Sequence, residues 1–214
     1  MADTSTVRVQ GTGSTFSVPD IATFVVTVSE VDATSKEVVQ KANEKVAKVL
    51  EALYTNGAKK EHLKTNRIQV NPKFEYKNNE SVQTGQEATV TIDVKLCRIN
   101  PDGKVLGKLI DEIVVINNIH VGGVNFDLED KTESKKKART LAFADALDKA
   151  QQYAELSGLK LGKVSSIDES GYNYSAPVAF AYSSEAVTKG GQQTQVEVGE
   201  YETSTTATIT WTLV

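Results

Sequence analysis

Residues 87–98 read Glu-Ala-Thr-Val-Thr-Ile-Asp-Val-Lys-Leu-Cys-Arg, a regular alternation of apolar and polar side chains. The apolar positions are Val90, Ile92, Val94 and Leu96, and the polar positions between them are Thr89, Thr91, Asp93 and Lys95. Because successive side chains of a strand point to opposite faces, the pattern predicts a strand with one buried and one hydrated face. Such strands are typical of antiparallel sheets that are covered on one side only.

Similar patterns predict strands before and after this one, at residues 7–16, 21–31, 65–77, 120–129, 163–169 and 201–214. In residues 21–31 the apolar face holds Ala22, Phe24, Val26 and Val28. Pro72 lies inside the strand predicted at 65–77, and a residue without an N–H favours an edge strand or a bulge there. Gly122-Gly123 predicts a bulge in the strand at 120–129.

Three segments change to the helical period, with apolar residues three and four positions apart. Residues 34–56 form the first, with Thr34 or Ser35 as its cap and Glu37 as a capping-box partner. The second follows Pro101-Asp102-Gly103, and the third covers residues 131–157. In the third helix an alanine recurs at every fourth position: Ala138, Ala142, Ala146, Ala150 and Ala154. This stripe of small side chains favours close packing in the core over a contact between subunits.

The predicted order of elements is β-β-α-β-β-α-β-α-β-β. It indicates an α+β fold, a mainly antiparallel sheet with about three helices packed on one face. We find no linker rich in Pro, Gly and Ser that would divide the core, so we expect residues 1–214 to form a single domain. A long irregular loop interrupts it at about residues 170–198.

Composition and charge exclude several classes of protein. The longest apolar run, Val178–Tyr182, has five residues, whereas a membrane-spanning helix needs about 20. The net charge is −4, which does not favour a nucleic-acid partner. The one basic run, Lys135-Lys136-Lys137, follows acidic residues, and we interpret it as a solvated helix face.

A search for catalytic motifs finds no P-loop and no G-x-S-x-G. Gly11-Thr12-Gly13 begins like a dinucleotide fingerprint, but position 16 is Phe, so a strand bulge with close backbone packing is the better interpretation. His62 and His120 are the only histidines; we expect His62 to be solvated and neither to bind zinc. Cys97 is the only cysteine, and we expect an inert structural thiol. We therefore predict no catalytic residue, cofactor or metal, although His120 meeting Cys97 or a serine in space would still allow an enzyme.

The irregular loop concentrates aromatic side chains, namely Tyr172, Tyr174, Phe180 and Tyr182. Loops of this length inside a domain are commonly functional or disordered. Three interpretations remain open: a flexible excursion, a contact surface for self-assembly or a partner, and a site for a small ligand. We take these four residues as candidate assembly contacts, because interfaces are enriched in Tyr and Phe.

Several short motifs, taken in order, resemble the SIMPL-domain family, which includes YggE-like bacterial envelope proteins. They are Val7-x-Val9-x-Gly11-x-Gly13, Val18-Pro19-Asp20-x-Ala22, Ala42-Asn43 with Val46, Leu53 and Gly57, Leu63-x-Thr65-x-x-Ile68-x-Val70-x-Pro72 with Phe74 and Tyr76, Val121-Gly122-Gly123-Val124-x-Phe126, and Ala154-x-x-x-Gly158-x-x-Leu161-Gly162-x-Val164. The resemblance extends from Val7 to Val214, and its motifs are structural rather than catalytic.

For bacterial members the resemblance implies export to the periplasm, a link to oxidative-stress defence, and self-association; eukaryotic members are signalling adaptors for a kinase. Met1–Thr6 has no signal-peptide features, so we expect a periplasmic or envelope protein if a leader has been removed, and a cytoplasmic one otherwise. We predict a non-enzymatic, self-associating cell-envelope protein whose edge strands or loop form the subunit contacts. The alternative is a monomeric adaptor or chaperone-like module with an unknown protein partner.

Overall fold

The computed structural model describes residues 5–77, 80–175 and 194–214. The chain divides into two compact units. The terminal unit comprises Met1–Val18, Leu128–Pro177 and Glu200–Val214, and the central unit comprises Pro19–Asp127 and Val178–Gly199. Each unit has its own antiparallel sheet and at least one helix of its own.

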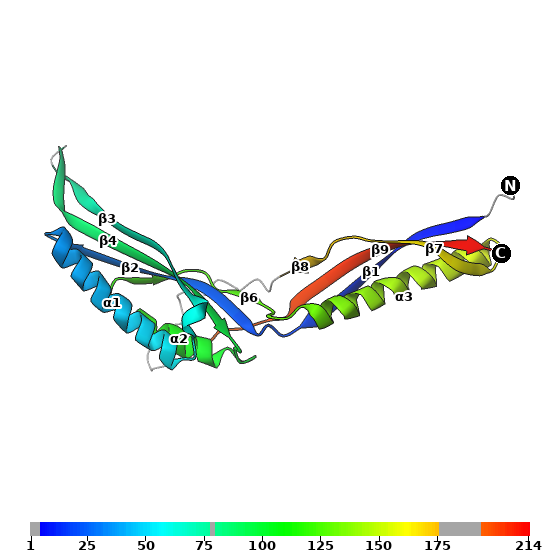
Figure 1. Cartoon of the computed structure of the whole chain (residues 1–214), viewed down its shortest axis with the longest axis horizontal. Helices are drawn as coiled ribbons and strands as arrows, with labels where there is room; N and C mark the ends of the chain where they lie inside the picture. The colour runs from blue at the N-terminus through cyan, green and yellow to red at the C-terminus, as the bar shows by residue number, and fades with distance from the viewer. Residues whose placement is uncertain (1–4, 78–79, 176–193) are drawn as a thin grey trace. The chain divides into compact units, whose positions relative to one another are not determined.

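The sheet of the terminal unit has the order β1-β9-β7, with β8 also paired to β9. These strands are β1 (Thr6–Ser17), β7 (Leu161–Glu169), β8 (Asn173–Ser175) and β9 (Tyr201–Leu213). Helix α3 (Thr132–Leu156) lies along one face of the sheet (Figure 1). The pairing of β1 with β9 runs without interruption from Thr6–Thr212 to Ser17–Tyr201. The bulge predicted at Gly11–Gly13 is therefore wrong.

The close backbone packing predicted at Gly11 and Gly13, by contrast, is confirmed. A Cβ atom built on Gly11 would lie 2.0 Å from the carbonyl oxygen of Ala142, and one on Gly13 would lie 2.0 Å from that of Ala138. The backbones of β1 and α3 are thus in direct contact. All five alanines of the predicted stripe are buried at this interface or next to it, which confirms that the stripe packs in the core.

Polar contacts also hold α3 to β1. The carboxylate of Asp145 accepts hydrogen bonds from Lys149 Nζ at 2.7 Å and from the Thr12 N–H at 2.8 Å. Lys149 Nζ also donates to the Gln10 carbonyl at 3.0 Å. The hydrogen bond from Lys149 and that from Thr12 lower the pKa of Asp145. These bonds lie at the edge of a core that includes Trp211, whose ring centroid is 6.2 Å from that of Phe143.

The sheet of the central unit has the order β3-β4-β2-β5, with β6 also paired to β2. Its strands are β2 (Ile21–Asp32), β3 (Leu63–Lys77), β4 (Glu80–Cys97), β5 (Ile119–Val121) and β6 (Asn125–Asp127). Helices α1 (Ser35–Thr55) and α2 (Lys104–Val114) lie on one face of it (Figure 1), and the short 3-10 helix η1 (Lys60–His62) precedes β3. The strand predicted at 120–129 is thus two short strands, separated at Gly122-Gly123.

The core of this unit follows the predicted alternation. Val90, Ile92, Val94 and Leu96 of β4 are all buried, as are Ala22, Phe24, Val26 and Val28 of β2. Helix α1 covers them with Val38, Ala42, Val49 and Leu53. The Thr34 hydroxyl caps this helix, accepting from the Glu37 N–H at 3.3 Å and donating to the Glu37 carboxylate at 2.8 Å. The predicted start of the helix is confirmed.

Two polar pairs connect α1 to β2, and they differ in burial. The Glu30 side chain is 8% exposed and accepts from Lys45 Nζ and, at 3.0 Å, from Asn118 Nδ2. Lys45 also donates to the Asn117 carbonyl at 2.8 Å. Lys41, with a side chain 56% exposed, pairs with Asp32. The first pair is part of the packed structure, whereas the second is accessible to solvent.

The predicted α+β class and the antiparallel strands are confirmed. The strands form two sheets, whereas a single sheet was expected. Of the loop predicted at 170–198, the described part includes β8 and residues 194–198. There Thr194 donates to Asp111 from both its N–H (3.0 Å) and its hydroxyl (2.5 Å), and Val198 is buried in the core of the central unit. These parts of the segment are therefore fixed to the two units.

Candidate functional site

Two of the four aromatic candidates form a cluster in the terminal unit. The rings of Tyr172 and Tyr174 are stacked, with centroids 6.4 Å apart and planes 22° apart. The Tyr201 ring, which is buried, lies 6.1 Å from that of Tyr174. Phe180 and Tyr182 lie outside the described residues. The structure thus adds Tyr201 to the cluster, a residue for which the sequence predicts only a position in a strand.

Cations from α3 and the residue before it lie over these rings. Lys131 Nζ is 4.7 Å from the ring centre of Tyr174 and 5.2 Å from that of Tyr201. Lys135 Nζ is 5.5 Å from the ring centre of Tyr172. Cation–π contacts at this distance are attractive. Lys136 and Lys137 are exposed, in agreement with the predicted solvated face, whereas Lys135 is half-buried because the turn before β8 brings Tyr172 under the helix.

Arg139, Glu169 and Tyr172 fix the position of the cluster. Arg139 Nε donates to both carboxylate oxygens of Glu169, at 3.1 and 3.3 Å, and Arg139 Nη2 donates to the Tyr172 hydroxyl at 2.7 Å. The Tyr172 hydroxyl in turn donates to Glu169 at 2.5 Å. Hydrogen bonds from Tyr172 and Arg139 lower the pKa of Glu169, whereas desolvation and then the bond to Glu169 raise the pKa of Tyr172. The result is an aromatic and cationic surface whose side chains are connected by hydrogen bonds.

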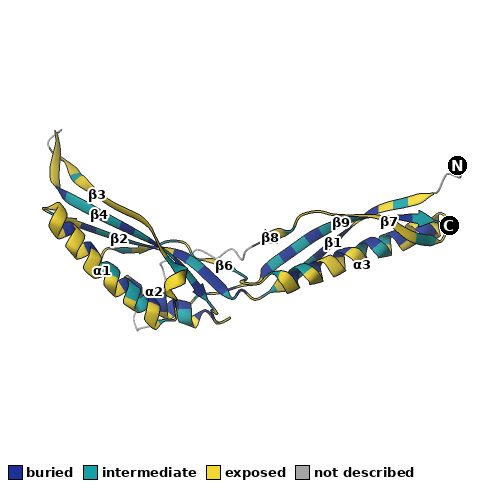
Figure 2. Cartoon of the chain, viewed as in Figure 1, coloured by how far each residue is buried: buried dark blue, intermediate teal, exposed yellow. Residues whose placement is uncertain are grey.

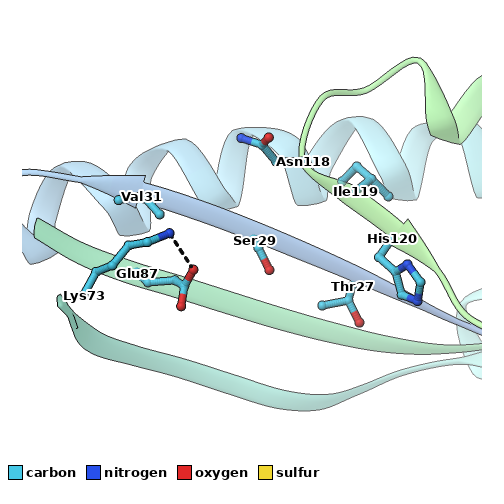
Figure 3. A pocket seen from close by; sticks show the side chains of 8 residues that line it. All are labelled: Thr27, Ser29, Val31, Lys73, Glu87, Asn118, Ile119 and His120. Atoms are coloured by element: carbon cyan, nitrogen blue, oxygen red, sulfur yellow. Dashed lines mark hydrogen bonds and ion pairs between the residues drawn. The ribbon is translucent and has the colours of Figure 1, made fainter. Parts of the chain in front are cut away.

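A second feature is a shallow pocket in the central unit, of about 410 Å³. Its floor is the face of β2 that points away from α1, with Thr27, Ser29 and Val31 (Figure 3). The other lining residues are Lys73, Glu87, Asn118, Ile119 and His120. Lys73 and Glu87 form an ion pair at 3.4 Å toward one end, and His120 lies toward the other (Figure 3).

This pocket offers hydroxyl groups and one charge of each sign, but both charged side chains are substantially exposed, at 38% and 42%. Its volume falls in the range of small-ligand sites, which are usually more enclosed and more apolar. Within the described residues, no group of three or more His, Cys, Asp or Glu side chains is placed to hold a metal ion. The pocket is thus a polar surface feature with an exposed ion pair at one end.

The structure brings His62, rather than His120, next to Cys97. His62 Nδ1 lies 3.6 Å from Cys97 Sγ, and the His62 side chain is only 18% exposed. On the other side of the ring, Nε2 is 3.7 Å from a carboxylate oxygen of Glu61. The prediction of a solvated His62 is wrong, because η1 leads into β3 and places this ring against the end of β4. A thiol beside an imidazole can be activated as a nucleophile, but this contact alone supplies no site for a substrate.

A third feature is the outer edge of the central sheet. Strand β3 is an edge strand, as Pro72 predicted. Its apolar residues are largely exposed: Ile68 by 70%, Val70 by 37%, Phe74 by 56% and Tyr76 by 73%. Figure 2 shows β3 exposed along most of its length, whereas β4 and β2 beside it have buried residues under α1. Contiguous apolar exposure of this kind usually marks an interaction surface.

Comparison with known sequences assigns the chain to a family. Residues 7–211 match the family described as "SIMPL: Protein of unknown function (DUF541)". The chain belongs to this family. Its members' shared sequence pattern covers both compact units, and the description attaches no reaction to it.

Named relatives are bacterial. The chain is 30% identical over 168 residues to the "26 kDa periplasmic immunogenic protein" of Brucella melitensis, a match that covers 76% of this chain and 66% of that protein. It is 26% identical over 185 residues to the "Uncharacterized protein YggE" of Escherichia coli K12, covering 86% of this chain and 74% of that one. The SIMPL chain thus spans about two thirds of the Brucella protein's length. In its described part, no helix is long and apolar enough to cross a membrane.

Proposed function

We propose that this SIMPL protein is a non-enzymatic, self-associating component of the bacterial cell envelope. The main observation in favour of self-association is the exposed edge of β3, where backbone and apolar side chains are both accessible. An open strand edge of this length readily pairs with another chain. The periplasmic name of the Brucella relative supports the location.

The tyrosine cluster is a second candidate contact. Tyr174 is 40% exposed, and it is stacked on Tyr172 and held under Lys131. Rigid aromatic side chains lose little conformational entropy on association, and this favours them at interfaces. We keep Tyr172, Tyr174, Phe180 and Tyr182 as candidate assembly contacts.

The role in the cell is part of the same proposal. The family resemblance implies a link to oxidative-stress defence, and we propose that the assembled protein acts there by binding rather than by catalysis. A catalytic activity of the purified protein that is abolished by Cys97→Ser or His120→Ala would contradict the non-enzymatic part. The Cys97→Ser variant also tests whether the contact between Cys97 and His62 contributes to any such activity.

The experiment that tests self-association is absolute mass by light scattering after size exclusion, over a tenfold range of concentration. We expect a discrete multiple of 23.2 kDa that survives dilution. A monomer throughout would contradict the proposal and favour the monomeric adaptor or chaperone-like module, whose partner would then be sought by pull-down. If the tyrosine cluster is a contact, deletion of residues 172–182 should lower the number of subunits in the assembly. An unchanged number of subunits would remove the cluster from the proposal.

A further inference from the structure

We infer that the β3 strands of two copies pair antiparallel around a two-fold axis at Asn71, so that Arg67 of each copy lies opposite Glu75 of the other. This inference rests on the proposed self-association and specifies its surface and its register. It follows from the position of β3 in the sheet, from the face on which its apolar side chains lie, and from the order of charges along it.

The position of β3 leaves one of its edges open. Strand β4 pairs with β3 from Leu63–Val94 to Lys77–Glu80, along its whole length. No other strand of the described sheet pairs with β3. Its backbone groups on the outer side are therefore available to a second chain, and an added antiparallel strand would extend the sheet by one.

The apolar side chains of β3 lie on the same face as the core. Ile68 is opposite Val90 and Val70 is opposite Ala88, and both partners are buried on the side of the sheet that α1 covers. The register shift after Lys73 lies in β4, where Thr84 has no partner in β3. Strand β3 itself remains regular at this point, so Phe74 lies on the same face as Ile68 and Val70. The stripe is thus an extension of the core face that α1 does not cover.

The sequence of β3 is complementary to itself about Asn71. Antiparallel pairing around this residue places Ile68 opposite Phe74 and Val70 opposite Pro72, which joins the two apolar stripes on one face. On the other face it places Arg67 opposite Glu75. Directly opposed residues of opposite charge stabilise a pair of strands, whereas like charges destabilise it.

Neighbouring registers lack this match. An axis at Val70 would place Arg67 opposite Lys73, and an axis at Pro72 would place it opposite Lys77, so that cations oppose one another in both cases. A slip by a single residue would send the apolar stripes of the two copies to opposite faces. The pairing around Asn71 is therefore favoured by both faces at once.

Two local features of β3 bear on how its charged side chains contribute to the pairing of two copies. Pro72 has no N–H, so β3 has one backbone donor fewer next to the proposed axis. Lys73 is already paired with Glu87. Arg67 is exposed, and among the described residues its side chain has no hydrogen-bond or ion-pair partner. Its guanidinium can therefore pair with the Glu75 carboxylate of another copy, although Glu75 already has an interaction within its own chain.

Charge reversal on the full-length protein tests the register. The variants are Arg67→Glu, Glu75→Arg and the double variant Arg67→Glu/Glu75→Arg, with dissociation constants measured by sedimentation at low ionic strength. Each single variant opposes like charges twice per pair of strands, so we expect about tenfold weaker association, equal to about 1.4 kcal/mol. The double variant restores both ion pairs with their signs exchanged. Its dissociation constant should therefore return to within about threefold of that of the original protein, since opposite charges across two strands attract in either order.

A mixture of the two single variants gives an independent result. One variant then has two anions and the other two cations at these positions, so we expect them to associate with each other more tightly than either does with itself. Lys48→Glu, the same change of charge as Arg67→Glu but on the exposed face of α1, should leave association unchanged. Circular dichroism of every variant verifies that the fold is intact.

The outcomes separate this inference from the proposed function. A protein that is monomeric at all concentrations contradicts self-association itself. In a second case the original protein self-associates while its single variants associate as strongly as Lys48→Glu, or while its double variant associates no more strongly than the single variants. Either result overturns the β3 pairing and leaves self-association itself supported. Weakening by both single variants and recovery in the double variant supports the pairing around Asn71.

Discussion

Replacing Gly13 by alanine tests whether direct backbone contact between β1 and α3 holds the terminal unit together. A Cβ on Gly13 would lie 2.0 Å from the Ala138 oxygen and 2.4 Å from the Ala142 nitrogen. Ordinary contacts of a Cβ begin at 3.4 Å, so strand and helix must separate by about 1.4 Å, because neither backbone atom can rotate away.

The cost follows from that separation. A gap of about 0.5–1 Å forfeits a quarter to a half of the dispersion attraction between the surfaces that it parts. The parted surfaces include buried Ala142, Ala146 and Ile209. Overpacking of a core typically costs about 1–3 kcal/mol, and we expect Gly13→Ala to cost about 3 kcal/mol because backbone atoms are involved. That is a large part of the roughly 5–15 kcal/mol that stabilises a typical protein.

Urea denaturation followed by tryptophan fluorescence measures this effect directly. The chain has one tryptophan, Trp211, which is 2% exposed in the core of the same unit. At a slope of about 1–3 kcal/mol per molar urea, the midpoint should fall by about 1 M or more. Gly171→Ala is the matched control, because a Cβ there meets nothing within 4 Å. Equal midpoints for the two variants would refute the argument.

Three further predictions concern α1 and α3. Thr34→Ala should destabilise the central unit by about 1 kcal/mol, since it removes the helix cap, whereas Thr34→Ser should retain most of the stability; equal losses in urea denaturation would contradict the cap. Lys45→Met should cost about 3 kcal/mol because it leaves the Glu30 carboxylate buried without its cation, whereas Lys41→Met should have a much smaller effect because that pair is exposed to solvent; a Lys41 variant as unstable as the Lys45 variant would contradict this. Asp145 has a lowered pKa, so its charge stabilises the folded state above the unfolded pKa of about 3.9 and this contribution is lost as the pH falls through the folded value. The difference in stability between the original protein and Asp145→Asn should therefore be present in full at about pH 7 and decrease as the pH falls below about 3.9. A difference independent of pH would contradict it.

The helices and strands could be predicted because their patterns are local. The alternation at Val90–Leu96 and the alanine stripe of α3 each depend on a few neighbouring residues, and the structure confirms both. The assignment of strands to two sheets could not be predicted in this way. Alternation shows which face of a strand is buried, but it does not show that Thr6 pairs with Thr212.

The same limit applies to the candidate sites. Tyr172 and Tyr174 were identifiable because aromatic residues are concentrated in one segment. The contact of His62 with Cys97 depends on the pairing of β3 with β4, which brings Leu63 opposite Val94. No local pattern encodes it. The contacts of Lys131 and Lys135 with the tyrosines likewise depend on where β8 and β9 place those rings.

Strand β3 shows how a local pattern and its environment can disagree in an informative way. Its alternation of apolar residues is as regular as that of β4, and in β4 the same pattern accompanies a buried face. In β3 the stripe from Ile68 to Tyr76 is exposed, because α1 packs on β2 and β4. An apolar face on an open strand edge promotes aggregation unless another segment or another chain covers it. The order of charges beside the stripe matches a second copy of the same strand, so self-pairing would account for both features of this edge.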